Sequence, residues 1–212
     1  MARSKSSKSW LQEHFKDEFV QQSWKDGYRS RATYKLIEIQ QKDKIIKPGQ
    51  VVVDLGAAPG GWSQYVADIL RNKNGDINGK IIGLDILPID PMDGVDFIQG
   101  DFREASVLAE LTEAVSAFDG IDLVISDIAP NISGMKAIDQ PRSMYLVELA
   151  YDFAINQLNA NGSFLCKVFH GSGFDELIRN ARKHFKRVII RKPKASRARS
   201  GETYLLAREL KN

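Results

Sequence analysis

Several features that mark other protein classes are scarce in this 212-residue chain. A single cysteine, Cys166, lies in the apolar stretch FLCKVF, so no disulfide can form within the chain and a reducing compartment is expected. His14, His170 and His184 lack the spacing of a metal site, and we expect no metal. No hydrophobic run approaches the length of a membrane span, and the basic start MARSKSSKSW has no apolar signal-peptide core. These absences predict a cytoplasmic protein that does not enter a membrane.

The most informative segment that is present is the stretch VVVDLGAAPGGW at residues 51–62. Its valines suit a buried parallel strand, and Gly56, Gly60 and Gly61 would let the backbone pass close to a ligand. The spacing departs from the dinucleotide fingerprint G-x-G-x-x-G, and Pro59 stands inside the turn. A dinucleotide needs free backbone amides at its pyrophosphate, whereas S-adenosylmethionine has no phosphate. The turn therefore favours S-adenosylmethionine as the cofactor.

Acidic residues stand at or just after the ends of the expected strands. Asp85 closes the stretch KIIGLD, and Asp101 comes directly after VDFIQG. A carboxylate at the end of the second strand can accept hydrogen bonds from both hydroxyls of a ribose. Each aspartate alone could simply end a strand at the surface. Together with Asp54 they favour a nucleoside-type cofactor.

Hydrophobic strands alternate with helical patterns along the chain, which predicts one α/β domain with a mostly parallel sheet and helices on both faces. Strands are expected at residues 51–55, 80–85, 95–99, 121–126, 163–169, 187–191 and 204–208. Helices are expected at residues 31–42, 62–71, 103–116, 142–158 and 174–185. Ligands of such sheets bind outside the carboxyl ends of the strands. We expect a basic N-terminal extension at residues 1–30 and a single domain at residues 31–212.

Charge is distributed unevenly, although the net charge is only +3. The balance of basic over acidic residues is +5 in residues 1–47, −12 in residues 48–178 and +10 in residues 179–212. Two basic ends around an acidic core indicate a nucleic-acid partner, unless the second end is merely a solvated helix face followed by a loop. The mixed composition of RKPKASRARSG suits a loop that follows phosphates better than a membrane helix. Arg197 and Arg199 in this loop are expected to contribute to RNA binding.

Further segments extend the pattern along most of the chain. They are WLQEHF, YRSRATYKLIEIQ, VDFIQGDF, SDIAPNISG, RSMYLVELA, KVFHGSGFDE and RKPKASRARSGETY. With the glycine-rich turn, these segments resemble the FtsJ-type RNA ribose 2′-O-methyltransferases from about residue 10 to residue 204. The resemblance implies a Rossmann-like fold that binds S-adenosylmethionine. It also implies methyl transfer to the ribose 2′-hydroxyl of a uridine in 23S ribosomal RNA, within the large ribosomal subunit.

The resemblance also assigns functional residues. The catalytic set falls on Lys35, Asp127, Lys167 and Glu202, and the cofactor is expected against Gly60, Trp62, Asp85, Asp101 and Asp127.

Each catalytic position has an ordinary alternative. Lys35 could be a surface lysine of a helix, Asp127 could cap a turn, and Glu202 could pair with nearby arginines. Lys167 lies among apolar neighbours, where an unpaired charge is costly, so it could instead form a purely structural pair with Asp127.

Lys167 itself has two possible roles in methyl transfer. The 2′-hydroxyl must approach the methyl carbon in line and lose its proton. Lys167 could accept that proton as a neutral amine, which burial and nearby positive charge favour. It could instead orient the hydroxyl as an ammonium, which Asp127 and Glu202 favour.

Two other function classes stay open. The chain could be an RNA-binding ribosome-assembly factor in which cofactor binding is regulatory, although a full catalytic set argues against a purely structural role. A nicotinamide dehydrogenase is disfavoured by Pro59 and by the basic flanks. No RRM, KH or OB pattern is present, so RNA binding is expected from the two basic segments and the groove between them. We expect a monomer.

Overall fold

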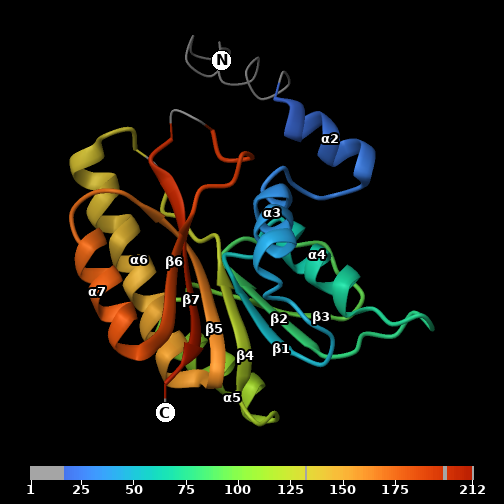
Figure 1. Cartoon of the computed structure of the whole chain (residues 1–212). Coiled ribbons are helices and arrows are strands. Elements are labelled where there is room, and N and C mark those ends of the chain that lie inside the picture. The colour runs from blue at the N-terminus through green and yellow to red at the C-terminus, as the bar shows by residue number, and fades with distance from the viewer. Residues whose placement is uncertain (1–16, 132, 198–199, 212) are drawn as a thin grey trace.

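A seven-stranded sheet forms the centre of the computed structural model, which describes residues 17–131, 133–197 and 200–211. The strand order is β3-β2-β1-β4-β5-β7-β6 (Figure 1). The strands are β1 Val51–Leu55, β2 Lys80–Asp85, β3 Val95–Gln99, β4 Ile121–Ser126, β5 Leu158–Phe169, β6 Phe185–Arg191 and β7 Glu202–Leu210. The first five strands pair in parallel, and β7 runs antiparallel to both β5 and β6. The predicted α/β class with a mostly parallel sheet is confirmed.

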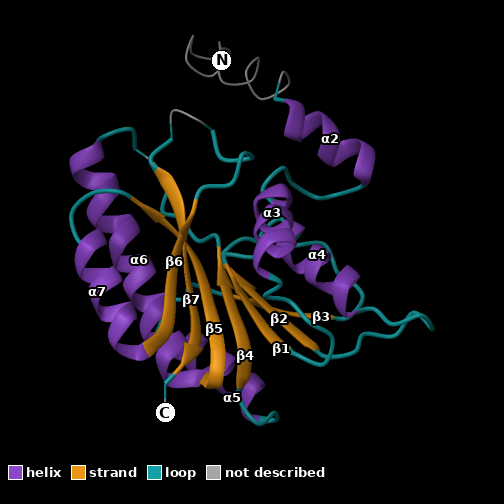
Figure 2. Ribbon diagram, in the orientation of Figure 1, coloured by secondary structure: helices purple, strands orange, loops and turns teal. Residues whose placement is uncertain are grey.

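Helices cover both faces of this sheet (Figure 2). The described helices are α2 Glu18–Asp26, α3 Thr33–Asp43, α4 Gly61–Leu70, α5 Ala105–Ser116, α6 Lys136–Gln157 and α7 Phe174–His184, and α3 to α7 cover the sheet. The core divides accordingly into two clusters of buried side chains. One joins α3 and α4 to the sheet, and the other joins α5, α6 and α7 to its opposite face. Helix α2 lies apart from the sheet, next to α3 (Figure 1).

The first four strands have the predicted bounds, because each is a short β-branched run closed by a turn residue. The later elements differ. Strands β5, β6 and β7 are longer than predicted, α2 was not predicted, and α6 begins at Lys136 instead of residue 142. A proline normally marks the start of a helix, yet Pro141 lies inside α6. The extra turn is held by Asp139, whose carboxylate accepts hydrogen bonds from the backbone N–H groups of Ser133 and Gly134.

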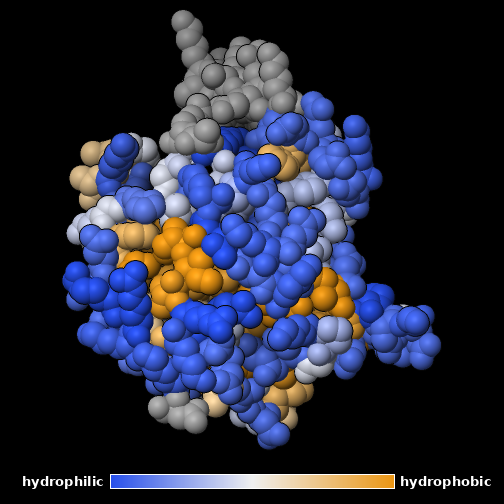
Figure 3. All heavy atoms as spheres, in the orientation of Figure 1, coloured by the Kyte–Doolittle hydropathy of each residue, from blue (hydrophilic) through white to orange (hydrophobic). Residues whose placement is uncertain are grey.

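Strand β6 forms one edge of the sheet, and the largest hydrophobic area of Figure 3 lies over it. Ile190 on this strand is 37% exposed. Lys186 and Arg187 precede it on the same strand and are exposed. Such charges on an edge strand oppose pairing with another sheet. Within the described residues, no helix is long and apolar enough to cross a membrane.

Candidate active site

The carboxylate of Asp54 is buried at the carboxyl end of β1. Its side chain accepts a hydrogen bond from the Ser63 hydroxyl at 2.7 Å, and its second oxygen, Oδ1, has no hydrogen-bond partner in the described structure. Burial, with the negative charges of Asp127 and Asp85, raises the pKa of Asp54 to about 7, although the Ser63 hydrogen bond opposes the rise. The site therefore contains a buried carboxyl group, one oxygen of which has no partner among the described residues.

The raised pKa predicts how stability depends on pH. An ordinary aspartate has a pKa of 3.8, so between that pH and about 7 the folded state holds a proton that the unfolded state has lost. The free energy of unfolding should consequently fall as the pH rises through this interval. For Asp54→Asn, the decrease between pH 5 and pH 8 should be smaller by about 2–3 kcal/mol, as measured by chemical denaturation.

The matched control for this titration is Asp122→Asn. It also removes a carboxylate from a strand, but Asp122 lies at the amino end of β4, away from the site. There it accepts a hydrogen bond from Val51 N–H at 2.8 Å. Equal pH dependence in wild type and Asp54→Asn would contradict the raised pKa.

Asp85 is the last residue of β2 and Asp101 follows β3, so both lie where the parallel strands end. The Asp85 carboxylate accepts hydrogen bonds from the backbone N–H groups of Ala58 at 3.0 Å and Leu87 at 2.9 Å, so it fixes the glycine-rich turn. Asp101 accepts hydrogen bonds from the guanidinium of Arg103, and those bonds hold the pKa of Asp101 below its ordinary value. The Asp101 carboxylate therefore stays charged at the edge where a cofactor would bind.

The glycine-rich turn is packed more closely than the sequence suggested. A Cβ atom at Gly56 would lie 2.8 Å from the backbone of Ile128, and one at Gly60 would lie 2.9 Å from the side chains of Arg29 and Met92. Gly60 also has a φ of +104°, which side-chain-bearing residues rarely adopt. Close packing against the Ile128 backbone therefore requires glycine at position 56, and the backbone conformation favours glycine at position 60.

Trp62 lies in the core under α3, so its side chain is a structural element. Its indole N–H donates to the Ala32 carbonyl at 2.9 Å, and its ring lies 5.8 Å from that of Tyr204. A contact between this residue and the cofactor stays a prediction, as do the cofactor contacts of Gly60, Asp85, Asp101 and Asp127.

The four residues of the predicted catalytic set form two ion pairs near the carboxyl ends of β4 and β5 and the amino end of the antiparallel β7. Lys167 Nζ lies 3.2 Å from Asp127 Oδ1 and donates to the Asp127 backbone carbonyl. Lys35 Nζ, from α3, lies 2.9 Å from Glu202 Oε1. The four side chains are between 9% and 18% exposed. Lys35 is thus no ordinary surface lysine, and within the described residues the ion-pair partner of Glu202 is this lysine.

Tyr204 joins the two pairs, and sequence reasoning missed it. Its hydroxyl group donates to Asp127 Oδ1 at 2.7 Å and lies 3.4 Å from Glu202 Oε1. Lys35 Nζ lies 5.8 Å from the centre of its ring. The only available signal was its position two residues after Glu202 on a strand, which places both side chains on one face.

Charge and hydrogen bonding keep the Asp127 carboxylate ionised. Burial alone would raise its pKa, but the charges of Lys167 and Lys35 and the Tyr204 hydrogen bond outweigh this effect and hold the pKa below its ordinary value. Burial, together with the negative charge of Asp127, raises the pKa of Tyr204 well above its ordinary range, so the tyrosine remains a hydrogen-bond donor. The site can therefore hold a fixed carboxylate beside a lysine amine.

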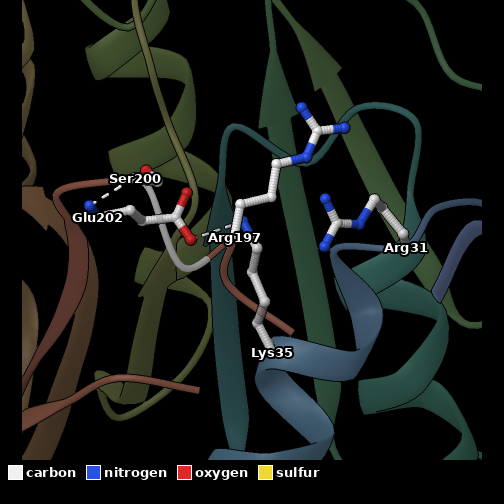
Figure 4. Close-up of a pocket in the computed structure, with 5 residues that line it drawn as sticks. All are labelled: Arg31, Lys35, Arg197, Ser200 and Glu202. Atoms are coloured by element: carbon white, nitrogen blue, oxygen red, sulfur yellow. Dashed lines mark hydrogen bonds and ion pairs between the residues drawn. The ribbon is translucent and has the colours of Figure 1, made fainter. Parts of the chain in front are cut away.

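A basic hollow of about 460 Å³ opens next to these pairs and is lined by Arg31, Lys35, Arg197, Ser200 and Glu202. Figure 4 shows the guanidinium groups of Arg31 and Arg197 on one side of this hollow and Glu202 on the other, with the Lys35 amine paired to Glu202.

Helix α3 holds the loop that closes the basic hollow. The Glu38 carboxylate accepts hydrogen bonds from the backbone N–H groups of Lys194 at 2.7 Å and Ala195 at 2.8 Å. The helix that supplies Lys35 thus also fixes the basic loop. Arg199, predicted to bind RNA, lies outside the described residues. Within the described part of the chain, no group of three or more His, Cys, Asp or Glu side chains could hold a metal ion.

Comparison with known proteins identifies the family. The model of the family described as FtsJ-like methyltransferase matches residues 28–210. The chain belongs to this family.

Other FtsJ-like methyltransferases resemble the chain over nearly its whole length. The protein named ribosomal RNA large subunit methyltransferase E from Dichelobacter nodosus is 60% identical, over 98% of this chain and 97% of its own length. Its namesake from Nitrosospira multiformis is 58% identical, over 97% of each chain. A crystal structure provisionally named a ribosomal RNA methyltransferase, from Plasmodium falciparum, superposes with a TM-score of 0.75 at 32% identity and covers 86% of this chain and 98% of its own.

A more distant structure shares the fold alone. Human methyltransferase-like protein 13, solved in complex with SAH, has a TM-score of 0.54 at 14% identity and covers 84% of this chain and 78% of its own. The Rossmann-like methyltransferase fold predicted for the FtsJ-like chain is confirmed.

Proposed function

We propose that the protein transfers a methyl group from S-adenosylmethionine to the ribose 2′-hydroxyl of a uridine in 23S ribosomal RNA, within the large ribosomal subunit. The observation that carries this proposal is the joined arrangement of Lys35, Asp127, Lys167 and Glu202 at the carboxyl edge of the sheet. The names of relatives that are 60% and 58% identical support ribosomal RNA as the substrate.

The carboxyl edge fits S-adenosylmethionine chemically. The unpartnered oxygen of Asp54 is buried there, and Asp85 and Asp101 provide carboxylates that can accept hydrogen bonds from hydroxyl or amino groups. A cluster of carboxylates suits a cationic sulfonium compound better than a pyrophosphate. When bound, this cofactor supplies an electrophilic methyl group.

The residues of the chain would hold the acceptor and manage its proton. The charge of Asp127 and the Tyr204 hydroxyl fix the Lys167 amine, which is in place to contact the ribose 2′-hydroxyl and to accept or orient its proton. Lys35 is held by Glu202 beside the basic hollow. The ribose oxygen then forms its bond to the methyl carbon as the bond from that carbon to sulfur breaks, and the proton leaves through Lys167 or to water.

The basic hollow is the proposed contact for the RNA backbone. Arg197 lines it and is 27% exposed, with Asp17 at 3.7 Å. Replacing Arg197 with alanine should weaken binding of large subunits about threefold to tenfold and make the salt dependence of binding shallower, because one phosphate contact is lost. Affinity for S-adenosylhomocysteine should stay unchanged.

Lys80→Ala is the matched control for the Arg197 variant. Lys80 is the first residue of β2, at the amino ends of the parallel strands and away from the basic hollow. Its amine pairs with the Asp96 carboxylate at 2.5 Å. If subunit binding by Arg197→Ala had the same salt dependence as wild type, Arg197 would not contact a phosphate and the phosphate contacts would lie elsewhere.

The proposed reaction is tested with large ribosomal subunits from cells that lack the protein. Labelled methyl groups from S-adenosylmethionine should appear on a ribose of one uridine in 23S ribosomal RNA. Binding of the subunit without any transfer would instead support an RNA-binding assembly factor in which the cofactor is regulatory.

We also propose a monomer whose methyltransferase domain spans residues 31–212, preceded by a basic extension at residues 1–30. The family match, which begins at residue 28, supports this division. The extension is not independent of the site, because Asp17 lies 2.9 Å from Arg31 at the edge of the basic hollow.

A further inference from the structure

A second hollow, of about 650 Å³, opens at the same edge of the sheet. Its walls come from the first turns of α6, from the turn after β5 and from the residue before β7. Among its lining residues are Ala137, Gln140, Pro141, Phe169, His170 and Gly201. Its size falls within the range of about 300–1,000 Å³ that small ligands occupy. None of the predicted catalytic or cofactor-binding residues lines it.

This second hollow adjoins the reaction centre. Phe169 follows Lys167 by two residues on β5, a distance of about 7 Å along a strand, and it pairs with Glu202 of β7. Gly201 lines the second hollow, whereas its neighbours Ser200 and Glu202 line the basic one. The beginning of β7 therefore separates the two hollows. A nucleotide bound with its ribose at Lys167 would lie between them.

The two hollows suit different parts of a nucleotide, one its charged phosphate and the other its flat base. The first is cationic and suits phosphate. The lining of the second includes Lys136 and Asp139, one charge of each sign, and the apolar side chains of Ala137, Pro141 and Phe169. At its wall, His170 stacks on Phe174 with ring centres 4.2 Å apart. Aromatic and apolar walls of this kind suit the flat faces of a base.

A polar group in the second hollow suits the edge of a base. The Gln140 amide nitrogen donates to the carbonyls of Phe169 at 3.3 Å and Ser172 at 3.4 Å. These bonds fix the side chain and leave its carbonyl oxygen able to accept a hydrogen bond from a base N–H group.

We propose that the second hollow binds a nucleobase of the substrate RNA, from the methylated nucleotide or its direct neighbour. This inference rests on the proposed function and adds a base-binding site to it. Phosphates in the basic hollow and a base in the second hollow would together place one ribose at Lys167, which backbone contacts alone cannot do because they carry no sequence information.

The test combines a variant that fills the second hollow with a crosslinking experiment that locates the bound base. Ala137 is exposed on α6, so Ala137→Trp occupies the hollow without disturbing the core. Ala109→Trp, on the exposed face of α5, is the matched control. Large subunits containing 4-thiouridine are bound in the presence of S-adenosylhomocysteine and irradiated, and the crosslinked peptide is identified.

With wild type and the Ala109 variant, a crosslink in residues 169–174 or 136–143 is expected. Ala137→Trp should lose it and raise KM for the subunit about tenfold or more, with affinity for S-adenosylhomocysteine unchanged. Normal methylation by wild type with crosslinks only outside these segments, or an unchanged KM for Ala137→Trp, would overturn the inference while leaving the proposed function intact. A wild-type protein that binds subunits, crosslinks there and transfers no methyl group would support the base site and contradict the proposed function.

Discussion

Lys167→Met should lower the rate of methyl transfer by about 10²–10⁴-fold, the usual contribution of a positioned proton-transfer group. Methionine has a similar length and suits a side chain that is 9% exposed, but it can neither accept a proton nor donate to the 2′-hydroxyl. Single-turnover transfer to large subunits measures the effect. Affinity for S-adenosylhomocysteine, measured by calorimetry, should change little, because the lysine faces the acceptor in the proposed mechanism.

Lys186→Met is the matched control for this loss. Lys186 is exposed on β6, where it donates to Asn161 Oδ1 at 2.9 Å, and its replacement should leave the rate unchanged. If Lys167→Met kept more than a tenth of wild-type activity, the catalytic role would be contradicted. Lys167 would then be only a structural partner of Asp127.

Lys167→Arg separates the two possible roles of the lysine. Arginine keeps the positive charge and the donors but does not lose a proton in proteins. If Lys167 orients the hydroxyl as an ammonium, the arginine variant should retain far more activity than the methionine variant. If Lys167 is the general base, both variants should be equally inactive. The wild-type pH–rate profile of the chemical step should then contain an ionisation that disappears in both.

Tyr204→Phe should reduce kcat about tenfold to a hundredfold with little change in KM for the subunit. The ring that packs against Trp62 remains, but Asp127 loses the hydrogen bond that it accepts at 2.7 Å, and hydrogen bonds to charged groups contribute about 1.5–3 kcal/mol. That bond lowers the pKa of Asp127, so its loss should raise the pKa and move the acidic limb of the pH–rate profile to higher pH.

The shifted pH profile distinguishes a positioning role for Tyr204 from simple packing. Tyr151→Phe is the matched control, because its hydroxyl lies 2.6 Å from His184 Nδ1 on the other face of the sheet and makes no contact with the ion pairs. An acidic limb at the same pH in Tyr204→Phe and wild type would show that the hydroxyl does not act through Asp127.

Sequence patterns predicted the elements whose structure depends on residues that are neighbours in the chain. The segment 51–62 reads as strand, turn and helix because β-branched residues, glycine and helical spacing follow one another, and the structure has these elements. The catalytic set was assigned by resemblance to a family, and Lys35 and Glu202 gave no signal of their own. They lie 167 positions apart and meet only because α3 packs over the beginning of β7.

Sequence alone determined the α/β class, the strand ends that carry Asp54, Asp85, Asp101 and Asp127, and the basic character of the chain's end. These depend on neighbouring residues and on the two-residue period of strands. Only the tertiary structure decided that β7 inserts antiparallel between β5 and β6, that Tyr204 joins two ion pairs, and that Asp54 is buried with a raised pKa. Each of these depends on burial and on contacts between distant segments, and no local pattern encodes which segments will meet.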